Sequence, residues 1–182
     1  MMKNALVILA GGKGKRFGQK TPKQFLKIGN TNFLNYILSN LDLSHFDIIN
    51  ISIDKKYQKT YFDHKVLSEK IKITYSKPGF TRQISSFTAL KNLKKFKIKN
   101  VLIHDAARPL CSNKLIKKII SKLDKNTNAI PYVEYNDRQL IKKNKLETKA
   151  INVQTPQGFN FDLILKILTQ KIFSYLIYIE ST

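Results

Sequence analysis

Short apolar runs alternate along this chain with stretches in which apolar residues recur every three or four positions. The runs are rich in branched residues, and such runs predict buried strands at 5–9, 48–53, 71–75, 101–104 and 129–133. The periodic stretches predict amphipathic helices at 33–41, 82–93 and 114–123. This alternation favours an α/β fold, with a mostly parallel, Rossmann-like sheet covered by helices on both faces.

The rest of the pattern contains no internal repeat and no proline-rich linker. At 182 residues the chain suits a single domain over 1–182. The stretch 134–149 is polar and charged with few apolar residues, so we expect it to leave the body, for example as a hairpin arm.

Composition narrows the class of protein. Hydrophobic residues make up 42% of the chain, enough for a packed core. Cys111 is the single cysteine, which excludes an intramolecular disulfide. The apolar start runs into glycines rather than a cleavage site, and the apolar segment 172–179 is too short for a membrane span. We therefore expect a cytoplasmic protein with no membrane association.

The net charge of +21 raises the question of an anionic partner. Only four of the 33 basic residues are arginine, and the lysines are spread over every segment, which favours a solvated lysine surface. A nucleic-acid-binding module is the alternative from another class, but no basic helix, aromatic platform or finger spacing supports it. We expect any DNA affinity to be nonspecific and to fall steeply with salt.

Unusual residues follow three of the predicted strands, and ligands of open parallel sheets bind at the carboxyl ends of strands. The segment 9–23 is rich in glycine and lysine, so its backbone N–H groups can surround an anion. It is not a Walker A loop, because Arg16 follows Lys15, nor a dinucleotide fingerprint, because Phe17 replaces the third glycine. It predicts a cradle for nucleoside triphosphate phosphates, with a purely structural turn as the alternative.

Individual side chains at these ends suggest chemistry. Arg16 and Lys23 are the cations that we expect to stabilise charge on a transferred phosphoryl group and on departing pyrophosphate. Asp105 is a candidate Mg²⁺ ligand, since Mg²⁺ takes one or two carboxylates plus phosphate oxygens; a helix cap or an ion pair with Arg108 is the alternative. We expect His104 to pack in the interior or to make a structural hydrogen bond, and we assign it no catalytic role.

Two further polar segments have less specific patterns. The segment 79–85 places Arg82 and a hydroxyl at a helix start, which suits recognition of a base, ribose or phosphate as well as it suits an ordinary helix start. The segment 154–158 predicts a polar turn with no evident chemistry.

Taken together, five segments resemble the 2-C-methyl-D-erythritol 4-phosphate cytidylyltransferase family in family order. They are 9–16, 21–26, 79–85, 104–109 and 154–159. The resemblance implies transfer of a cytidylyl group from CTP to methylerythritol phosphate, with release of pyrophosphate, with Mg²⁺ and without a covalent intermediate. It also implies homodimers that exchange a β-arm, placed here at about 134–150.

The same resemblance implies the roles of individual residues. Asp105 would hold the metal, Arg16 and Lys23 would be the catalytic cations, and Thr155 would lie near the acceptor phosphate. The nucleotide-binding residues would be Ala10, Gly11, Gly12, Gly79, Arg82 and Ser85.

Two departures from the family concern the acceptor. Glu147 stands where the arm of the family carries an arginine, with Lys145 and Lys149 nearby as substitutes. The family also continues for several dozen residues past Phe159, with a lysine for the acceptor and a second metal-facing aspartate, and the last dozen residues here resemble neither motif. We expect the family's C-terminal segment to be missing, which leaves an inactive CTP-binding remnant as an alternative.

The nearest rival enzyme is ribitol 5-phosphate cytidylyltransferase, which shares the glycine loop and the polar turn. Ala107, where that family tends to have valine, favours the isoprenoid enzyme.

Overall fold

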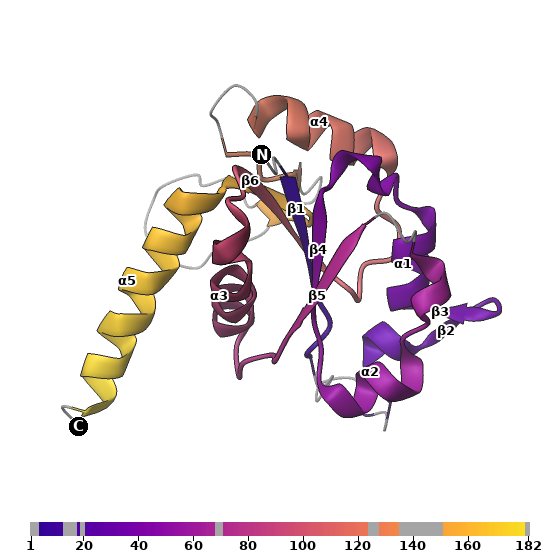
Figure 1. The fold of residues 1–182 in the computed structure, drawn as a ribbon, viewed down its shortest axis with the longest axis horizontal. Helices are drawn as coiled ribbons and strands as arrows, with labels where there is room; N and C mark the ends of the chain where they lie inside the picture. Colours follow the sequence, from indigo (N-terminus) through magenta and orange to yellow (C-terminus); the bar gives the residue numbers. More distant parts are fainter. Residues whose placement is uncertain are drawn as a thin grey trace.

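The computed structural model describes residues 4–12, 18, 21–67, 71–123, 128–134 and 151–180, with side chains described as far as 172. Its centre is a five-stranded sheet in the order β5-β4-β1-β6-β9 (Figure 1). Four strands are parallel: β1 (Asn4–Leu9), β4 (Ile48–Ser52), β5 (Lys72–Ser76) and β6 (Asn100–Asp105). The edge strand β9 (Gln157–Asn160) runs antiparallel to β6. The predicted α/β class with a mostly parallel sheet is confirmed.

Helices cover both faces of the sheet, because alternate residues of each central strand point to opposite sides. Leu6 and Ile8 join one buried core with α1 (Phe33–Asn40) and α4 (Asn113–Leu123). Ala5 and Val7 join the other core with α3 (Arg82–Leu93) and α5 (Phe161–Glu180). Figure 1 shows α3 and α5 together on one side of the sheet.

Shorter elements complete the described chain. The helix α2 spans Lys55–Tyr61, and a small hairpin joins β2 (Lys27–Ile28) to β3 (Thr31–Asn32). Four 3₁₀ turns lie at Lys23–Phe25, Leu43–His45, His64–Val66 and Lys94–Phe96. No helix in the described part of the chain has the length and apolarity to cross a membrane.

The prediction for 129–133 is wrong as a strand of the central sheet. Ala129 makes only a single bridge to Gly158, and β7 (Tyr132–Glu134) pairs with β8 (Ile151–Val153) in a separate ribbon. Every residue of this ribbon is exposed, so its apolar residues do not enter the core as the sequence suggested. The fifth strand is β9, which was not predicted and whose first two residues overlap the predicted polar turn at 154–158.

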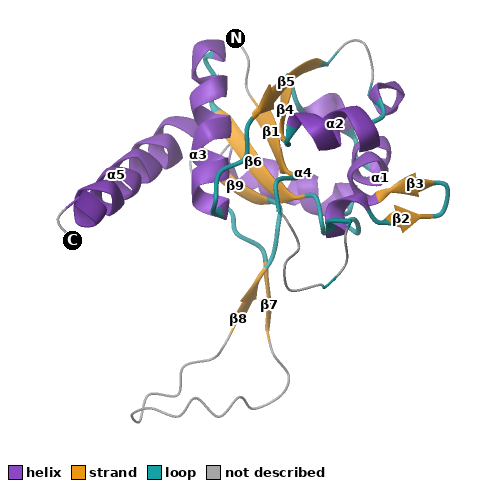
Figure 2. Ribbon diagram, turned by 90° about the horizontal axis from the view of Figure 1, so that it is seen from below, coloured by secondary structure: helices purple, strands orange, loops and turns teal. Residues whose placement is uncertain are grey.

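The β7–β8 ribbon projects from the body at the place predicted for an arm (Figure 2). Its register pairs Tyr132 with Val153 and Glu134 with Ile151. The rest of the predicted arm, including Glu147 and the two lysines beside it, lies outside the described residues.

Candidate nucleotide and metal site

The carboxyl ends of the central strands meet at one edge of the sheet. Leu9 is in register with both Ser52 and Asp105. The backbone N–H of Ala10 donates to the carbonyl oxygen of Ser52 at 2.8 Å, and that of Ala106 donates to Leu9 at 3.0 Å. The loops after β1 and β6 therefore leave the sheet side by side, as the strand pattern predicted.

The glycine loop after β1 is held against two other segments. A methyl group on Gly11 would lie 2.1 Å from Cβ of Pro78, so the backbone at this position approaches the loop after β5 too closely for a side chain. The buried side-chain amide of Gln24 donates to the carbonyl oxygens of Ala10 and Gly12, both at 2.8 Å. These bonds fix the loop next to the segment that carries Lys23, whereas Arg16 lies outside the described residues.

Two side-chain hydroxyls hold the first turn of α3 to the loop that precedes it. The Thr81 hydroxyl oxygen caps the helix by accepting from the N–H of Ile84 at 3.2 Å. The buried Ser85 hydroxyl accepts from the N–H of Gly79 at 3.0 Å and donates to the carbonyl of Thr81 at 2.9 Å. Ser85 thus shapes the loop between β5 and α3, while Arg82, the first residue of α3, reaches the end of β6 through its own bond to Asp105.

Asp105 ends β6 with its carboxylate between two arginines. The Nε atom of Arg82 lies 3.1 Å from Oδ1, and that of Arg108 lies 3.6 Å from Oδ2. The side chain of Asp105 is 27% exposed and both arginines are 43% exposed. The pair with Arg108 was one of the alternatives that the sequence left open, whereas the pair with Arg82 joins two of the three strand-end loops.

The turn from Gln154 to Gln157 reaches every member of this ion-pair cluster. Oε1 of Gln154 accepts from Nη1 of Arg108, and Oε1 of Gln157 accepts from Nη2 of Arg82 at 3.2 Å. Between them, the Thr155 hydroxyl oxygen accepts from the backbone N–H of Asp105 at 3.3 Å. The residues by themselves predicted a polar turn here, and the family resemblance singled out the segment 154–159 and assigned a role to Thr155 but none to either glutamine.

His104 lies behind Asp105 with 1% of its surface exposed. Its Nε2 is 3.1 Å from the carbonyl oxygen of Arg108, and its Nδ1 is 3.1 Å from the hydroxyl of Thr155. Desolvation lowers the pKa of His104 to about 4, so the ring is neutral at pH 7. The expected structural hydrogen bond is confirmed.

The sequence-predicted residues therefore divide into three groups. Gly79 bonds to Ser85, and Arg82 and Thr155 both bond to Asp105, whereas Ala10 and Gly11 lie at the same edge of the sheet, with Gly11 against Pro78. Gly12 and Lys23 are linked to them through Gln24. Arg16 is not described.

Asp105 suits a metal ion that takes only one or two of its ligands from the protein. Among the described residues there is no group of three or more acidic, histidine or cysteine side chains that could hold an ion alone. A single, partly exposed carboxylate fits Mg²⁺, which keeps waters and takes its other ligands from substrate phosphates. A metal at Asp105 would either share the carboxylate with the two arginines or displace one of them.

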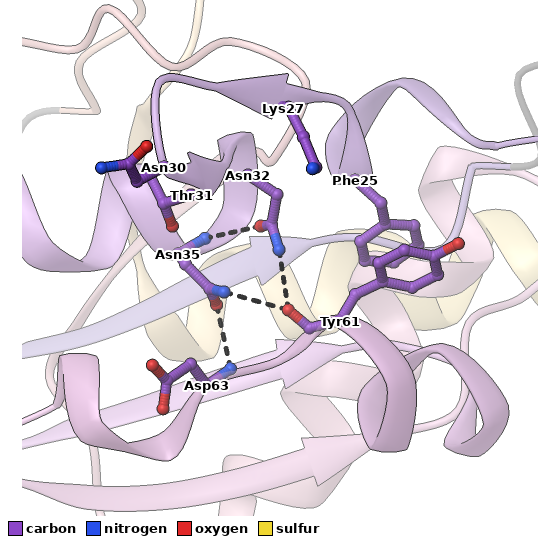
Figure 3. A pocket seen from close by; sticks show the side chains of 8 residues that line it. All are labelled: Phe25, Lys27, Asn30, Thr31, Asn32, Asn35, Tyr61 and Asp63. Atoms are coloured by element: carbon purple, nitrogen blue, oxygen red, sulfur yellow. Dashed lines mark hydrogen bonds between the residues drawn. The ribbon is translucent and has the colours of Figure 1, made fainter.

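A separate cavity of about 250 Å³ lies between α1, α2 and the β2–β3 hairpin (Figure 3). The amides of Asn32 and Asn35 both donate to the carbonyl oxygen of Tyr61, at 2.7 and 2.9 Å. Oδ1 of Asn35 accepts from the N–H of Asp63 at 3.2 Å, and the ring of Tyr61 stacks on Phe25 at 4.8 Å. These bonds fasten α2 to α1, and none of the predicted site residues lines the cavity.

Comparison with known proteins places this geometry in a family. A family model described as 2-C-methyl-D-erythritol 4-phosphate cytidylyltransferase matches residues 4–175. The enzyme of that name from Thermotoga neapolitana is 34% identical over 88% of this chain and 74% of its own length. The bifunctional enzyme IspD/IspF from Pelagibacter ubique is 35% identical over 93% of this chain and 46% of its own length.

Solved structures agree with the sequence relatives. The 4-diphosphocytidyl-2C-methyl-D-erythritol synthase of Anaerococcus prevotii superimposes with a TM-score of 0.76 at 25% identity, covering 93% of this chain and 76% of that one. The bifunctional IspDF of Campylobacter jejuni gives 0.73 at 29% identity, covering 92% and 43%. This chain spans about half the length of the bifunctional relatives and about three quarters of the single-function ones. It belongs to the 2-C-methyl-D-erythritol 4-phosphate cytidylyltransferase family.

Proposed function

We propose that this protein is a cytidylyltransferase, acting through one nucleotidyltransferase domain. It would convert CTP and 2-C-methyl-D-erythritol 4-phosphate to 4-diphosphocytidyl-2-C-methyl-D-erythritol and pyrophosphate, for isoprenoid precursor synthesis. The observation that carries the proposal is the cluster at Asp105, which joins the strand-end carboxylate to Arg82 of the α3 loop and to the turn at Thr155. The reaction is the one for which the matching family and its relatives are named.

The nucleotide would bind where the glycine loop faces the start of α3. Backbone N–H groups of the loop and of the helix start suit phosphate and base contacts, because they concentrate partial positive charge. Arg82 has donors to spare beyond its bond to Asp105, so it can reach a nucleotide oxygen. The proposed nucleotide-binding residues are Ala10, Gly11, Gly12, Gly79, Arg82 and Ser85.

Asp105 would hold Mg²⁺ together with phosphate oxygens of CTP. The ion supplies charge neutralisation of the triphosphate when it is bound. In exchange for the metal, Arg82 or Arg108 would release a carboxylate oxygen and become available to a phosphate.

The transfer itself would be a single displacement. An oxygen of the acceptor phosphate forms a bond to the α-phosphorus while the bond from that phosphorus to the bridging oxygen breaks, and pyrophosphate leaves with the electron pair. Lys23 and Arg16 would stabilise the charge that builds on the phosphoryl group and on the leaving group. Thr155 lies against the backbone of Asp105, so an acceptor bound beside it would face the nucleotide phosphates.

The assembly and the compartment belong to the same proposal. The exposed β7–β8 ribbon, with Tyr132, Val133, Ile151 and Val153 open to solvent, supports a homodimer that exchanges this arm. A lone cysteine, Cys111, supports a reducing compartment such as the cytoplasm.

Pyrophosphate release tests the proposal directly. The protein is mixed with CTP, Mg²⁺ and either methylerythritol phosphate or ribitol 5-phosphate, with reactions lacking an acceptor as the blank. Release with methylerythritol phosphate supports the proposed reaction. Release with ribitol phosphate alone would mean that ribitol phosphate, and not methylerythritol phosphate, is the acceptor. CTP binding without pyrophosphate release in any reaction would identify a remnant that binds the nucleotide but does not turn it over.

A further inference from the structure

His104 takes part in no step of the proposed reaction, yet it is a deeply buried polar group directly beside Asp105. It is 1% exposed, and its two ring nitrogens bond to Thr155 and Arg108. Thr155 bonds to the backbone N–H of Asp105, and the guanidinium of Arg108 lies beside its carboxylate. The side chain cannot touch a substrate, so any effect on the reaction has to pass through these neighbours.

The direction of each hydrogen bond follows from the acceptors. The carbonyl oxygen of Arg108 only accepts, so Nε2 of His104 carries the proton and donates to it. In the neutral ring Nδ1 is then an acceptor, and the hydroxyl of Thr155 donates to it. The lone pairs of that hydroxyl are left facing the N–H of Asp105, which donates to them.

These hydrogen bonds form a relay that runs from the carbonyl of Arg108 through His104 and the Thr155 hydroxyl to the N–H of Asp105. The relay orients both ends of the ion-pair cluster. One end holds the backbone of Asp105 against Thr155, and the other holds the backbone of Arg108, whose guanidinium lies 3.6 Å from Asp105. Because no bond can be reversed without losing a donor or an acceptor, the relay admits one arrangement of the turn relative to β6.

We propose that His104 is a positioning residue of the nucleotide and metal site, which fixes Asp105 and Arg108 in register with the turn at Thr155 so that the carboxylate can share a metal with CTP. The proposal rests on the CTP and metal site of the proposed function, but not on its acceptor or on turnover.

Three substitutions separate the two bonds of the relay. His104→Phe keeps an aromatic ring and removes both bonds. His104→Asn places an amide oxygen where Nδ1 stands, so it keeps an acceptor for Thr155. His104→Gln reaches one bond further and keeps a donor for the carbonyl of Arg108. Asn100→Leu is the matched control, because Asn100 is 2% exposed in the same strand and its amide bonds to Asn4 at the opposite end of the sheet.

The experiment is calorimetric titration of each variant with CTP, once with Mg²⁺ and once with EDTA, without any acceptor. We expect Mg²⁺ to tighten CTP binding to the wild-type protein. His104→Phe should lose about 10- to 100-fold of the affinity measured with Mg²⁺ and keep the affinity measured with EDTA. His104→Asn should retain more of the gain than His104→Gln, since Thr155 bonds directly to Asp105. Asn100→Leu should retain all of it.

Several results would overturn the inference. They are an unchanged Mg²⁺ gain in His104→Phe, an equal loss with Mg²⁺ and EDTA, an equal loss in Asn100→Leu, or no Mg²⁺ gain in the wild-type protein. If His104→Phe fails to fold, the test is the comparison of His104→Asn with His104→Gln. A Mg²⁺ gain in His104→Asn that is equal to or smaller than the gain in His104→Gln contradicts the proposal. A wild-type protein that shows the Mg²⁺ gain but releases no pyrophosphate would refute the reaction and leave the role of His104 standing.

Discussion

Two polar clusters in this molecule join segments that are distant in the sequence, and they differ in what they bond to. Around the cavity beside α1, the amides of Asn32 and Asn35 bond to backbone atoms of Tyr61 and Asp63. Around Asp105, charged side chains bond to other side chains and stay partly exposed. Backbone bonds of this kind hold elements together, whereas partly exposed ion pairs can be exchanged for a ligand at small cost.

The largest effect that would test this difference is on turnover. Asp105→Asn keeps the shape of the side chain and removes the charge that would bind the metal. We expect pyrophosphate release to fall by about 100-fold or more, because loss of a metal ligand should cost at least as much as the loss of a residue that supports one. The midpoint of thermal unfolding should stay near the wild-type value, because the ion pairs that are lost are partly exposed.

The activity of Asp105→Asn is compared with that of Asn35→Asp, a change of the same size in the other cluster. Comparable activity in Asp105→Asn and the wild-type protein would mean that Asp105 is only an ion-pair partner.

The second effect is on stability as a function of pH. Burial lowers the pKa of His104 from the ordinary 6.5 to about 4. The unfolded chain therefore binds a proton between these values while the folded protein does not, so the free energy of unfolding falls as the pH drops from 6.5 towards 4. The loss attributable to His104 is on the order of 3 kcal/mol at the acid end of this window.

Urea unfolding of the wild-type protein and of His104→Gln at several pH values within this window measures that loss. The Gln variant, which cannot titrate there, should show a shallower dependence, and parallel curves for the two proteins would exclude His104 as the source.

A third and smaller effect belongs to the cavity. Asn32 caps α1 by accepting from the N–H of Asn35 at 3.0 Å, and it also donates to Tyr61. Asn32→Ala removes the cap and should lower the free energy of unfolding by about 1–2 kcal/mol. Urea unfolding measures the loss, and CTP affinity measured in parallel should be unchanged. If the Asn32→Ala protein is fully folded but binds CTP clearly more weakly than the wild-type protein, the two clusters are coupled.

The smallest stability effect is expected for Arg82→Gln. The arginine is 43% exposed, so removing its ion pair should change the free energy of unfolding by less than about 1 kcal/mol. The affinity of the Arg82→Gln protein for CTP should fall nevertheless, because we assign Arg82 a nucleotide contact. Calorimetry with CTP in EDTA separates the two, and unchanged affinity would remove Arg82 from the nucleotide-binding residues.

Much of the framework was predictable from the order of residues. The strands β1, β4 and β6 are short branched runs, and each begins and ends within one residue of its prediction. Asp105 follows such a run directly, so its position at the carboxyl edge needed only the parallel order of the sheet. The edge strand β9 could not be found this way, because Gln157–Asn160 is short and carries a glycine, which weakens a strand pattern.

What the sequence determined by itself was the α/β order and the edge of the sheet at which polar residues gather. This is because hydrophobic periodicity is a local property of a few neighbouring residues. The tertiary structure decided which polar residues meet there. Arg108 and Gln154 are 46 residues apart, and Arg82 and Gln157 are 75 apart. Glutamine is equally at home in a solvated turn, so only the packing of that turn against β6 gives these side chains their partners.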